Sequence, residues 1–110
     1  MPTRLTPEQR LERLRPLPGW SYRDERGGLI SREYRFKNFV DAFEFMRQMA
    51  VVSETLQHHP EWSNVYQRVS VILTTHDADG LTDLDIVWAT EAEAIAREIL
   101  GQGPKSTTFG

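Results

Sequence analysis

Apolar residues along the chain follow two spacings, one typical of strands and one typical of helices. Residues 30–36 alternate between two sides: one side carries Ile30, Tyr34 and Phe36 together with Arg32, and the other carries only polar side chains. This period of two predicts a strand. The polar, glycine-rich turn at residues 24–28 precedes it and predicts a hairpin with a short strand at residues 20–23.

Three helices are predicted from apolar spacings of three and four residues and from capping residues at their starts. Thr6 begins the first helix with a capping-box pattern. Asn38 begins a long second helix that extends to His58, and Thr82 begins a third that continues to Leu100.

A second hairpin is predicted between the second and third helices. Val65 and Tyr66 belong to its first strand, and residues 69–73 alternate in its second strand, with a turn near residues 67–68. The second strand ends near His76. The order is therefore α-β-β-α-β-β-α, and the fold class is α+β.

Length and composition narrow the class of protein. We expect one domain over residues 1–110, with a core at about 5–100 and a loose C-terminal tail. A formal net charge of −3 argues against direct nucleic-acid binding, and the absence of cysteine excludes disulfides and thiolate zinc sites. No stretch has the apolar length of a signal peptide or a membrane span, so we expect a cytoplasmic protein that does not bind membranes.

All three histidines of the sequence, His58, His59 and His76, lie near predicted ends of elements. Pro60 disfavours the α region for the residue before it, so the second helix must end at the histidine pair. Glu54 lies four residues before His58, a spacing that places both side chains on one helix face. This grouping suggests a functional site.

Each of these residues also has a purely structural interpretation. A histidine at a helix C-terminus stabilises the helix dipole, and Asp85 is also the acidic member of a capping box with Thr82. Trp62 and Tyr66 are equally well interpreted as core residues or as walls of a pocket for a flat ring. A zinc or iron site is the main chemical alternative, but we predict no metal, because adjacent histidines rarely converge on one ion.

Two motifs carry a resemblance to a known family. The first reads Glu54-x-x-x-His58-His59-Pro60-x-Trp62-x-x-Val65-Tyr66, and the second reads Thr75-His76-x-x-x-Gly80-Leu81-Thr82-x-x-Asp85-Ile86. Both resemble the signature of pterin-4a-carbinolamine dehydratases, and the resemblance extends over nearly all of residues 5–100. Gln57 departs from it, because relatives often carry a charged residue there.

The resemblance implies a fold and an assembly. The fold is a four-stranded antiparallel sheet with helices packed on one face, in agreement with the order derived above. Members of the family commonly form tetramers. An open sheet in a domain this small also leaves two edges to cover, so we expect a homotetramer or a homodimer.

The resemblance also implies an activity, that of a 4a-hydroxytetrahydrobiopterin dehydratase. Such a hydro-lyase eliminates water from a 4a-hydroxytetrahydropterin to give the quinonoid dihydropterin, a step in tetrahydrobiopterin recycling. No cofactor is expected, because the pterin is the substrate. The implied roles are acid–base catalysis by His58 and His76, pterin holding by His59, orientation of imidazoles by Glu54 and Asp85, and pocket shaping by Pro60, Trp62 and Thr75.

The alternative function is a non-catalytic scaffold or a dimerisation cofactor built on the same fold, since fold does not determine function. In the resembled family some members assist a homeodomain transcription factor, so a transcription factor or a hydroxylase is a candidate partner. The presence of all three histidines with Glu54 and Asp85 favours the enzyme, because a scaffold has no chemical reason to keep them together.

Overall fold

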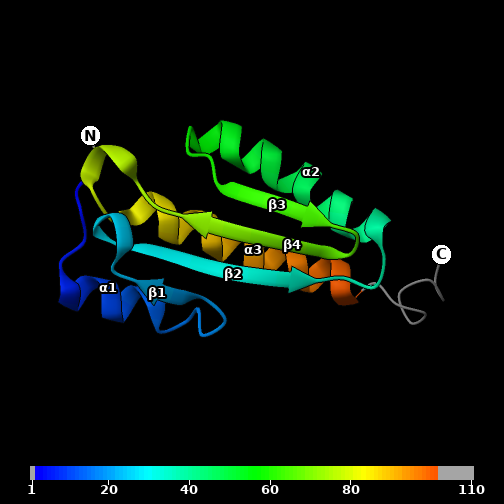
Figure 1. The fold of residues 1–110 in the computed structure, drawn as a ribbon, viewed down its shortest axis with the longest axis horizontal. Coiled ribbons are helices and arrows are strands. Elements are labelled where there is room, and N and C mark those ends of the chain that lie inside the picture. The colour runs from blue at the N-terminus through cyan, green and yellow to red at the C-terminus, as the bar shows by residue number, and fades with distance from the viewer. Residues whose placement is uncertain (1, 102–110) are drawn as a thin grey trace.

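The computed structural model describes residues 2–101 of the chain (Figure 1). Within this range the helices are α1 (Pro7–Leu14), α2 (Phe39–Leu56) and α3 (Asp83–Gly101), and the strands are β1 (Ser21–Arg23), β2 (Leu29–Arg35), β3 (Glu61–Val65) and β4 (Arg68–Leu73). Two single-turn 3-10 helices, η1 (Glu25–Gly27) and η2 (His76–Ala78), follow β1 and β4. Apart from these two turns, the observed order confirms the predicted α-β-β-α-β-β-α arrangement.

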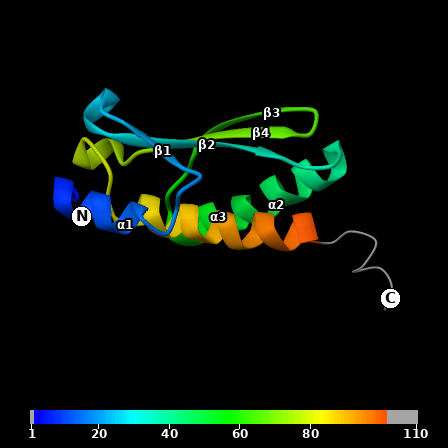
Figure 2. The same ribbon diagram turned by 90° about the horizontal axis from the view of Figure 1, so that it is seen from below.

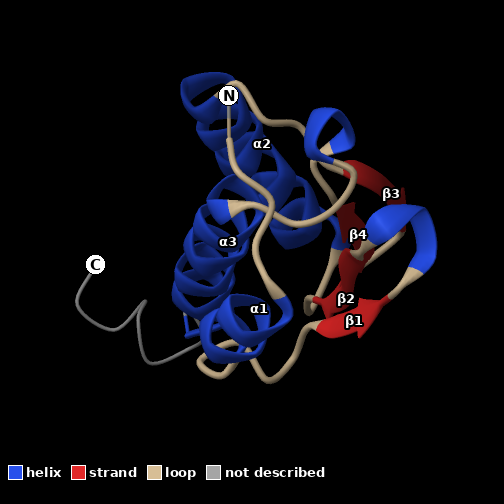
Figure 3. Ribbon diagram, turned by 90° about the vertical axis from the view of Figure 1, so that its left-hand side faces the viewer, coloured by secondary structure: helices blue, strands red, loops and turns tan. Residues whose placement is uncertain are grey.

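The four strands form one antiparallel sheet in the spatial order β1-β2-β4-β3. The three α-helices, α1, α2 and α3, lie on the same face of the sheet, as the end-on view of Figure 3 and the side view of Figure 2 show. The expected α+β fold is therefore confirmed. In this strand order the start of β2, the end of β4 and the start of β3 lie at the same end of the sheet, since Ile30 pairs with Leu73 and Glu61 pairs with Ile72.

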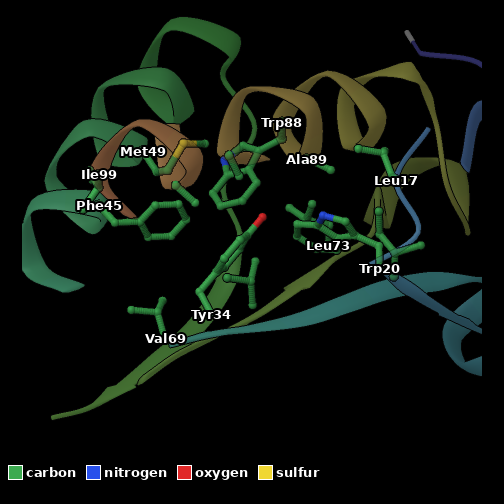
Figure 4. Close-up of a cluster of buried hydrophobic side chains, with 14 of the residues drawn as sticks. Leu17, Trp20, Tyr34, Phe45, Met49, Val69, Leu73, Trp88, Ala89 and Ile99 are labelled. Atoms are coloured by element: carbon green, nitrogen blue, oxygen red, sulfur yellow. The ribbon is translucent and has the colours of Figure 1, made fainter. Parts of the chain in front are cut away.

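The core lies between the sheet and the helices (Figure 4). The period of two predicted for β2 turns Ile30 and Tyr34 inward, where both are buried. Tyr34 packs against Phe45 of α2, with ring centroids 4.8 Å apart, and Trp88 of α3 is fully buried. Truncation of an aromatic side chain in such a core typically costs about 3–5 kcal/mol, so these contacts fix the helices to the sheet.

The predicted helix starts are confirmed by their capping bonds. Thr6 and Gln9 form the capping box of α1, and the Asn38 side chain accepts a hydrogen bond from the backbone N–H of Asp41 at the start of α2. At the start of α3 the Thr82 hydroxyl accepts from the N–H of Leu84. Each of these bonds satisfies a backbone donor that the helix itself leaves unpaired.

Several element boundaries differ from the prediction, among them the end of the last strand, since β4 ends at Leu73 and His76 lies in η2. Helix α2 ends at Leu56 rather than at His58, because Gln57 adopts the left-handed conformation with φ 53° and ψ 43°. Tyr66 lies in the turn between β3 and β4 rather than in a strand. The Asn64 amide donates to the carbonyl oxygens of Tyr66 and Arg68, and these bonds hold the turn.

The loose tail that we predicted lies outside the described residues. Within residues 2–101 no helix has the length and apolar character that crossing a membrane requires.

Candidate functional site

A pocket of about 560 Å³ lies at the end of the sheet where β4 ends and β3 begins. It receives residues from five places in the sequence: the segment before α1, η1, the start of β3, the end of β4, and η2. Its lining residues are Arg4, Arg26, Gly27, His59, Glu61, Thr74, His76 and Asp79. Two of the three predicted histidines, His59 and His76, therefore meet in one pocket.

His59 is placed by the way α2 ends. The N–H of His58 donates to the carbonyl of Ser53 at 3.0 Å, and that of Gln57 donates to the carbonyl of Glu54 at 3.3 Å. These two bonds around a left-handed residue form a Schellman motif, which turns the chain away from the helix axis. The exposed imidazole of His59 then lies 2.6 Å, Nε2 to Oε2, from the carboxylate of Glu54.

This geometry corrects the predicted partner of Glu54. The spacing of four residues suggested that Glu54 would orient His58, but that spacing holds only where the helix continues. Because Gln57 ends the helix, His58 turns inward and is buried, and Glu54 contacts His59 instead. His58 is not among the residues that line the pocket.

Asp85 is fully buried at the start of α3 and binds three separate parts of the chain. Its Oδ1 accepts from Nε2 of His58 at 2.6 Å, and its Oδ2 accepts from the hydroxyl of Thr75 at 2.7 Å and from the backbone N–H of Thr82 at 2.9 Å. Asp85 thus acts both as the capping carboxylate of α3 and as a partner of the predicted site, two roles that the sequence left open.

The residues that Asp85 binds directly precede the two histidines of the pocket. His58 is followed by His59, and Thr75 is followed by His76, the first residue of η2. One carboxylate therefore fixes the backbone from which both pocket imidazoles project. Two imidazoles that face the same volume can donate a proton to one atom of a ligand and accept one from another.

The other predicted pocket residues occupy different positions. Thr75 is buried in the Asp85 network, and it is the neighbouring Thr74 that lines the pocket. Trp62 faces the helices, where its ring centroid lies 6.0 Å from that of Trp88, and Pro60 links α2 to β3. Tyr66 is exposed at the opposite end of β3 and takes no part in the pocket.

The sequence interpretation missed several charged residues of the pocket, chiefly Arg4, Arg26 and Glu61. The guanidinium of Arg26 donates two hydrogen bonds to Glu61, at 2.7 and 3.2 Å, and these bonds lower the pKa of the Glu61 carboxyl below its usual range. Arg4 donates to the carbonyl of Gly27 at 2.9 Å. The strand order would have revealed Arg26 and Glu61, since it brings the turn before β2 and the start of β3 to the same end of the sheet, on either side of β4.

Two glycines allow the loops around the pocket to approach each other closely. Gly27 has a φ of 81°, and a Cβ placed on it would lie 2.0 Å from the carbonyl oxygen of Asp79. Gly80 has a φ of 156°, and its Cβ would lie 2.7 Å from the carbonyl oxygen of Gly27. Only glycine tolerates both the conformation and the contact at these positions.

Metal binding is not suggested by the arrangement of the described residues. Between residues 2 and 101 no group of three or more histidine, aspartate or glutamate side chains is arranged to hold a metal ion. Each of the two histidines nearest α2 instead has a carboxylate partner, His58 with Asp85 and His59 with Glu54.

Comparison with known sequences places these residues in a family context. The family described as "Pterin 4 alpha carbinolamine dehydratase" matches residues 3–95. A Bradyrhizobium protein (strain BTAi1), provisionally named a pterin-4-alpha-carbinolamine dehydratase, is 50% identical over 96 residues, which cover 87% of this chain and 96% of that protein. A Prochlorococcus marinus protein (strain MIT 9313) with the same provisional name is 50% identical over 87 residues, covering 79% of this chain and 88% of the relative.

Solved structures agree with the fold. The crystal structure of a transcriptional coactivator/pterin dehydratase from Brucella melitensis superposes with a TM-score of 0.81 at 49% identity, covering 86% of this chain and 99% of that one. A pterin dehydratase-like protein described as a RuBisCO assembly factor of the alpha-carboxysome has a TM-score of 0.62 at 18% identity, covering 71% and 89%. At 18% identity, the similarity to the RuBisCO assembly factor concerns the fold alone.

Proposed function

The chain belongs to the pterin-4a-carbinolamine dehydratase family, and we propose that it eliminates water from a 4a-hydroxytetrahydropterin to give the quinonoid dihydropterin. The observation that carries the proposal is that His59 and His76, from distant parts of the sequence, line the same pocket. The reaction would return the pterin product of a hydroxylase to a form that can be reduced again.

The chemistry requires two proton transfers and no change of oxidation state. The bond between C4a and the hydroxyl oxygen breaks, and the hydroxyl leaves as water after receiving a proton. The proton on the adjacent ring nitrogen, N5, is lost, and a double bond forms between C4a and N5. An imidazole is suited to both transfers, because histidine is the side chain whose ordinary pKa lies closest to neutral pH.

We assign the two transfers to His59 and His76. The resemblance pointed to His58 and His76, but His58 is buried and its Nε2 is directed at Asp85, so the geometry favours its neighbour. Nε2 of His59 donates to Glu54, which leaves Nδ1 of that ring to exchange a proton. His58 becomes a positioning residue, which acts by holding the backbone of His59.

The test is a dehydration assay with a 4a-hydroxytetrahydropterin generated enzymatically, run in the presence of a chelator. His59→Gln and His76→Gln should each lower the single-turnover rate by about 10²–10⁴-fold, the usual contribution of a positioned acid or base. His58→Gln is the comparison: its amide can still donate to Asp85, so it should lose less rate.

Two results would overturn the proposal. The parent protein would show no dehydration above the buffer rate, or both pocket variants would retain near-parental rates. Activity that the chelator abolishes and that zinc or iron restores would show that a metal, rather than the imidazole pair, supplies the catalysis.

A binding function remains the second candidate, supported by exposed apolar side chains on the outer side of α2. Phe39, Val40, Phe43 and Val51 are all largely exposed, a pattern that marks sites of protein association. The Brucella relative is titled both a coactivator and a pterin dehydratase. A parent protein that binds no pterin but captures a protein partner through α2 would favour this function over catalysis.

A further inference from the structure

The ion pair between Arg26 and Glu61 forms one side of the pocket and is unused by the chemistry above. Glu61 begins β3 and alternates with Trp62, which faces the helices, so Glu61 lies on the open face of the sheet, and Arg26 reaches it from η1, on the far side of β4. Both side chains line the same volume as His59 and His76. A charged pair at this place is available to a ligand that enters the pocket.

The pair is pre-organised in its present position. Arg26 holds the left-handed conformation, with φ 54° and ψ 34°, which an arginine adopts only when its surroundings compensate for the strain. Its guanidinium contacts both oxygens of Glu61, at 2.7 and 3.2 Å. Because these bonds lower the pKa of Glu61, the carboxylate is ionised and acts only as an acceptor at neutral pH.

The hydrogen-bonding capacity of the pair is only partly used. A carboxylate has about four lone-pair positions, and Arg26 occupies two of those on Glu61. A guanidinium has about five N–H groups, so Arg26 also retains free donors. Without breaking their ion pair, Glu61 therefore offers two acceptor positions and Arg26 offers a donor beside them.

A pterin presents the complementary pattern along its pyrimidine edge. The 2-amino group and the N3–H are donors, and the 4-oxo oxygen beside them is an acceptor. A carboxylate that meets two adjacent N–H groups forms the strong, charge-assisted type of hydrogen bond. A 2,4-dioxopteridine, such as lumazine, replaces the 2-amino donor with a carbonyl oxygen, which a carboxylate repels.

Resting on the proposed function, we propose that Glu61 and Arg26 recognise the 2-amino-4-oxopyrimidine edge of the pterin and thereby fix its orientation in the pocket. Glu61 accepts from the 2-amino group and from N3–H, and Arg26 donates to the 4-oxo oxygen. Since His59 lies only two residues before Glu61, recognition of this edge sets which part of the ring faces the imidazoles. The pair is a specificity device and takes no part in proton transfer.

The test measures the dissociation constants of oxidised, unreactive pterin and lumazine by fluorescence titration. The parent protein should bind pterin about 10- to 100-fold more tightly than lumazine, the range expected for hydrogen bonds to a charged group. Glu61→Gln should bring the ratio close to one, because an amide can donate to the 2-oxo group. Arg26→Met should weaken both ligands, since both have the 4-oxo group.

The matched control is Glu33→Gln, which removes a carboxylate from the open face of β2 outside the pocket and should leave the ratio unchanged. Equal binding of the two ligands by the parent, or an unchanged preference in Glu61→Gln, would overturn the recognition proposal while the proposed dehydration stands. A parent protein that binds neither ligand would instead count against the proposed function itself.

Discussion

Asp85 accepts hydrogen bonds from the end of α2, from the end of β4 and from the start of its own helix. A hydroxyl has one proton, and Thr75 already donates its proton to Asp85. Thr82 must therefore be the donor in the 2.8 Å hydrogen bond between the hydroxyls of Thr75 and Thr82. The buried network is thus internally consistent. Removing one of its acceptors would leave a buried donor unpaired, which is costlier than losing the bond alone.

Asp85→Asn tests this network with almost no change in side-chain volume. The amide has one acceptor oxygen in place of two and no negative charge, so the His58 imidazole must lose its acceptor or change tautomer, and we expect the free energy of unfolding to fall by about 1–3 kcal/mol. The dehydration rate should fall as well, because the backbone before both pocket histidines is released. Urea denaturation and the single-turnover assay measure the two effects.

Asp83→Asn is the control for Asp85→Asn. Asp83 lies two residues earlier and pairs with Arg13 at the surface, so its loss should cost less than about 1 kcal/mol. An Asp85→Asn protein as stable as this control would show that the network contributes little.

At the residue scale the sequence identified the histidines, Glu54 and Asp85 but not how they pair. The spacing of Glu54 and His58 predicts contact only on a continuous helix, and a glutamine gives no strong signal of the left-handed turn that ends α2. Contacts between His58 and Asp85 join residues 27 positions apart, and no local pattern encodes them.

At the scale of elements, the end of α2 is held by an unfavourable residue. Gln57 is left-handed, a conformation that costs an ordinary residue about 1 kcal/mol or more relative to glycine. We predict that Gln57→Gly raises the free energy of unfolding by about 0.5–1 kcal/mol, after loss of the bond from the Gln57 side chain to the carbonyl of Glu54. Thermal or urea denaturation measures the change.

The same substitution in the middle of α2 should have the opposite sign. Gln48 has ordinary helical neighbours, and Gln48→Gly should lower stability by about 1 kcal/mol. If Gln57→Gly and Gln48→Gly lowered stability equally, the left-handed conformation of Gln57 would not strain the folded protein.

We predict that the contact between the sheet and α3, made by Tyr34 and Glu93, weakens at high pH. Burial, together with the hydrogen bond to Glu93, raises the pKa of the Tyr34 phenol above its ordinary value. Below about pH 10 the phenol is protonated in both the folded and the unfolded chain, so the stability that the raised pKa of Tyr34 contributes is fully present there. Above that pH the unfolded chain ionises first, so the free energy of unfolding should fall by up to about 1.4 kcal/mol per pH unit for this group.

Tyr34→Phe should therefore reduce the loss of stability between about pH 10 and 12. Burial also raises the pKa of Tyr22, so part of the slope should remain. Urea denaturation at a series of pH values, with Tyr66→Phe as the control for removing a phenol, measures the slope. An identical slope in the parent and in Tyr34→Phe would exclude this residue as its source.

Periodicity and capping chemistry predicted most elements because both are local properties. The alternation in β2 and the caps at Thr6, Asn38 and Thr82 needed only neighbouring residues. The start of β3 was missed, because the polar residues of its sequence Glu-Trp-Ser-Asn-Val hide the period of two. Its pairing with β4 supplies what the local pattern lacks.

At the scale of the whole molecule, one side of α2 is covered by neither the sheet nor the other helices. Val40, Phe43 and Val51 are 71%, 56% and 60% exposed, and at about 100° per residue they fall on one side of the helix. The outer strands β1 and β3 also leave sheet edges open. Small domains commonly cover such surfaces by self-association.

We predict a homodimer or homotetramer that uses the α2 surface. Phe43→Lys should shift the assembly to a smaller species in light scattering at micromolar concentration. Leu11→Lys, which changes a similarly exposed apolar residue of α1, should leave the assembly unchanged. A parent protein that is monomeric, or equal dissociation of both variants, would contradict the use of this surface.

Strand order was the part of the fold that the sequence could not supply. Two antiparallel hairpins joined by a helix can be arranged side by side in more than one way, and only the order β1-β2-β4-β3 brings η1, the end of β4 and the start of β3 together. The family resemblance implied a four-stranded antiparallel sheet, but it gave no strand order either. The charged residues that line the pocket with the histidines follow from this order.

The close approach of Gly27 and Gly80 bears on how the pocket can change during evolution. Where these loops meet, the pocket wall is formed by main-chain atoms, which offer the same carbonyl and amide groups whatever the sequence. Neither glycine can acquire a side chain without moving the opposite loop. A new ligand preference must therefore arise on the walls built from side chains, at Arg4, Arg26 or Glu61. Random mutagenesis that selects for altered pteridine choice should recover substitutions there and none at the two glycines.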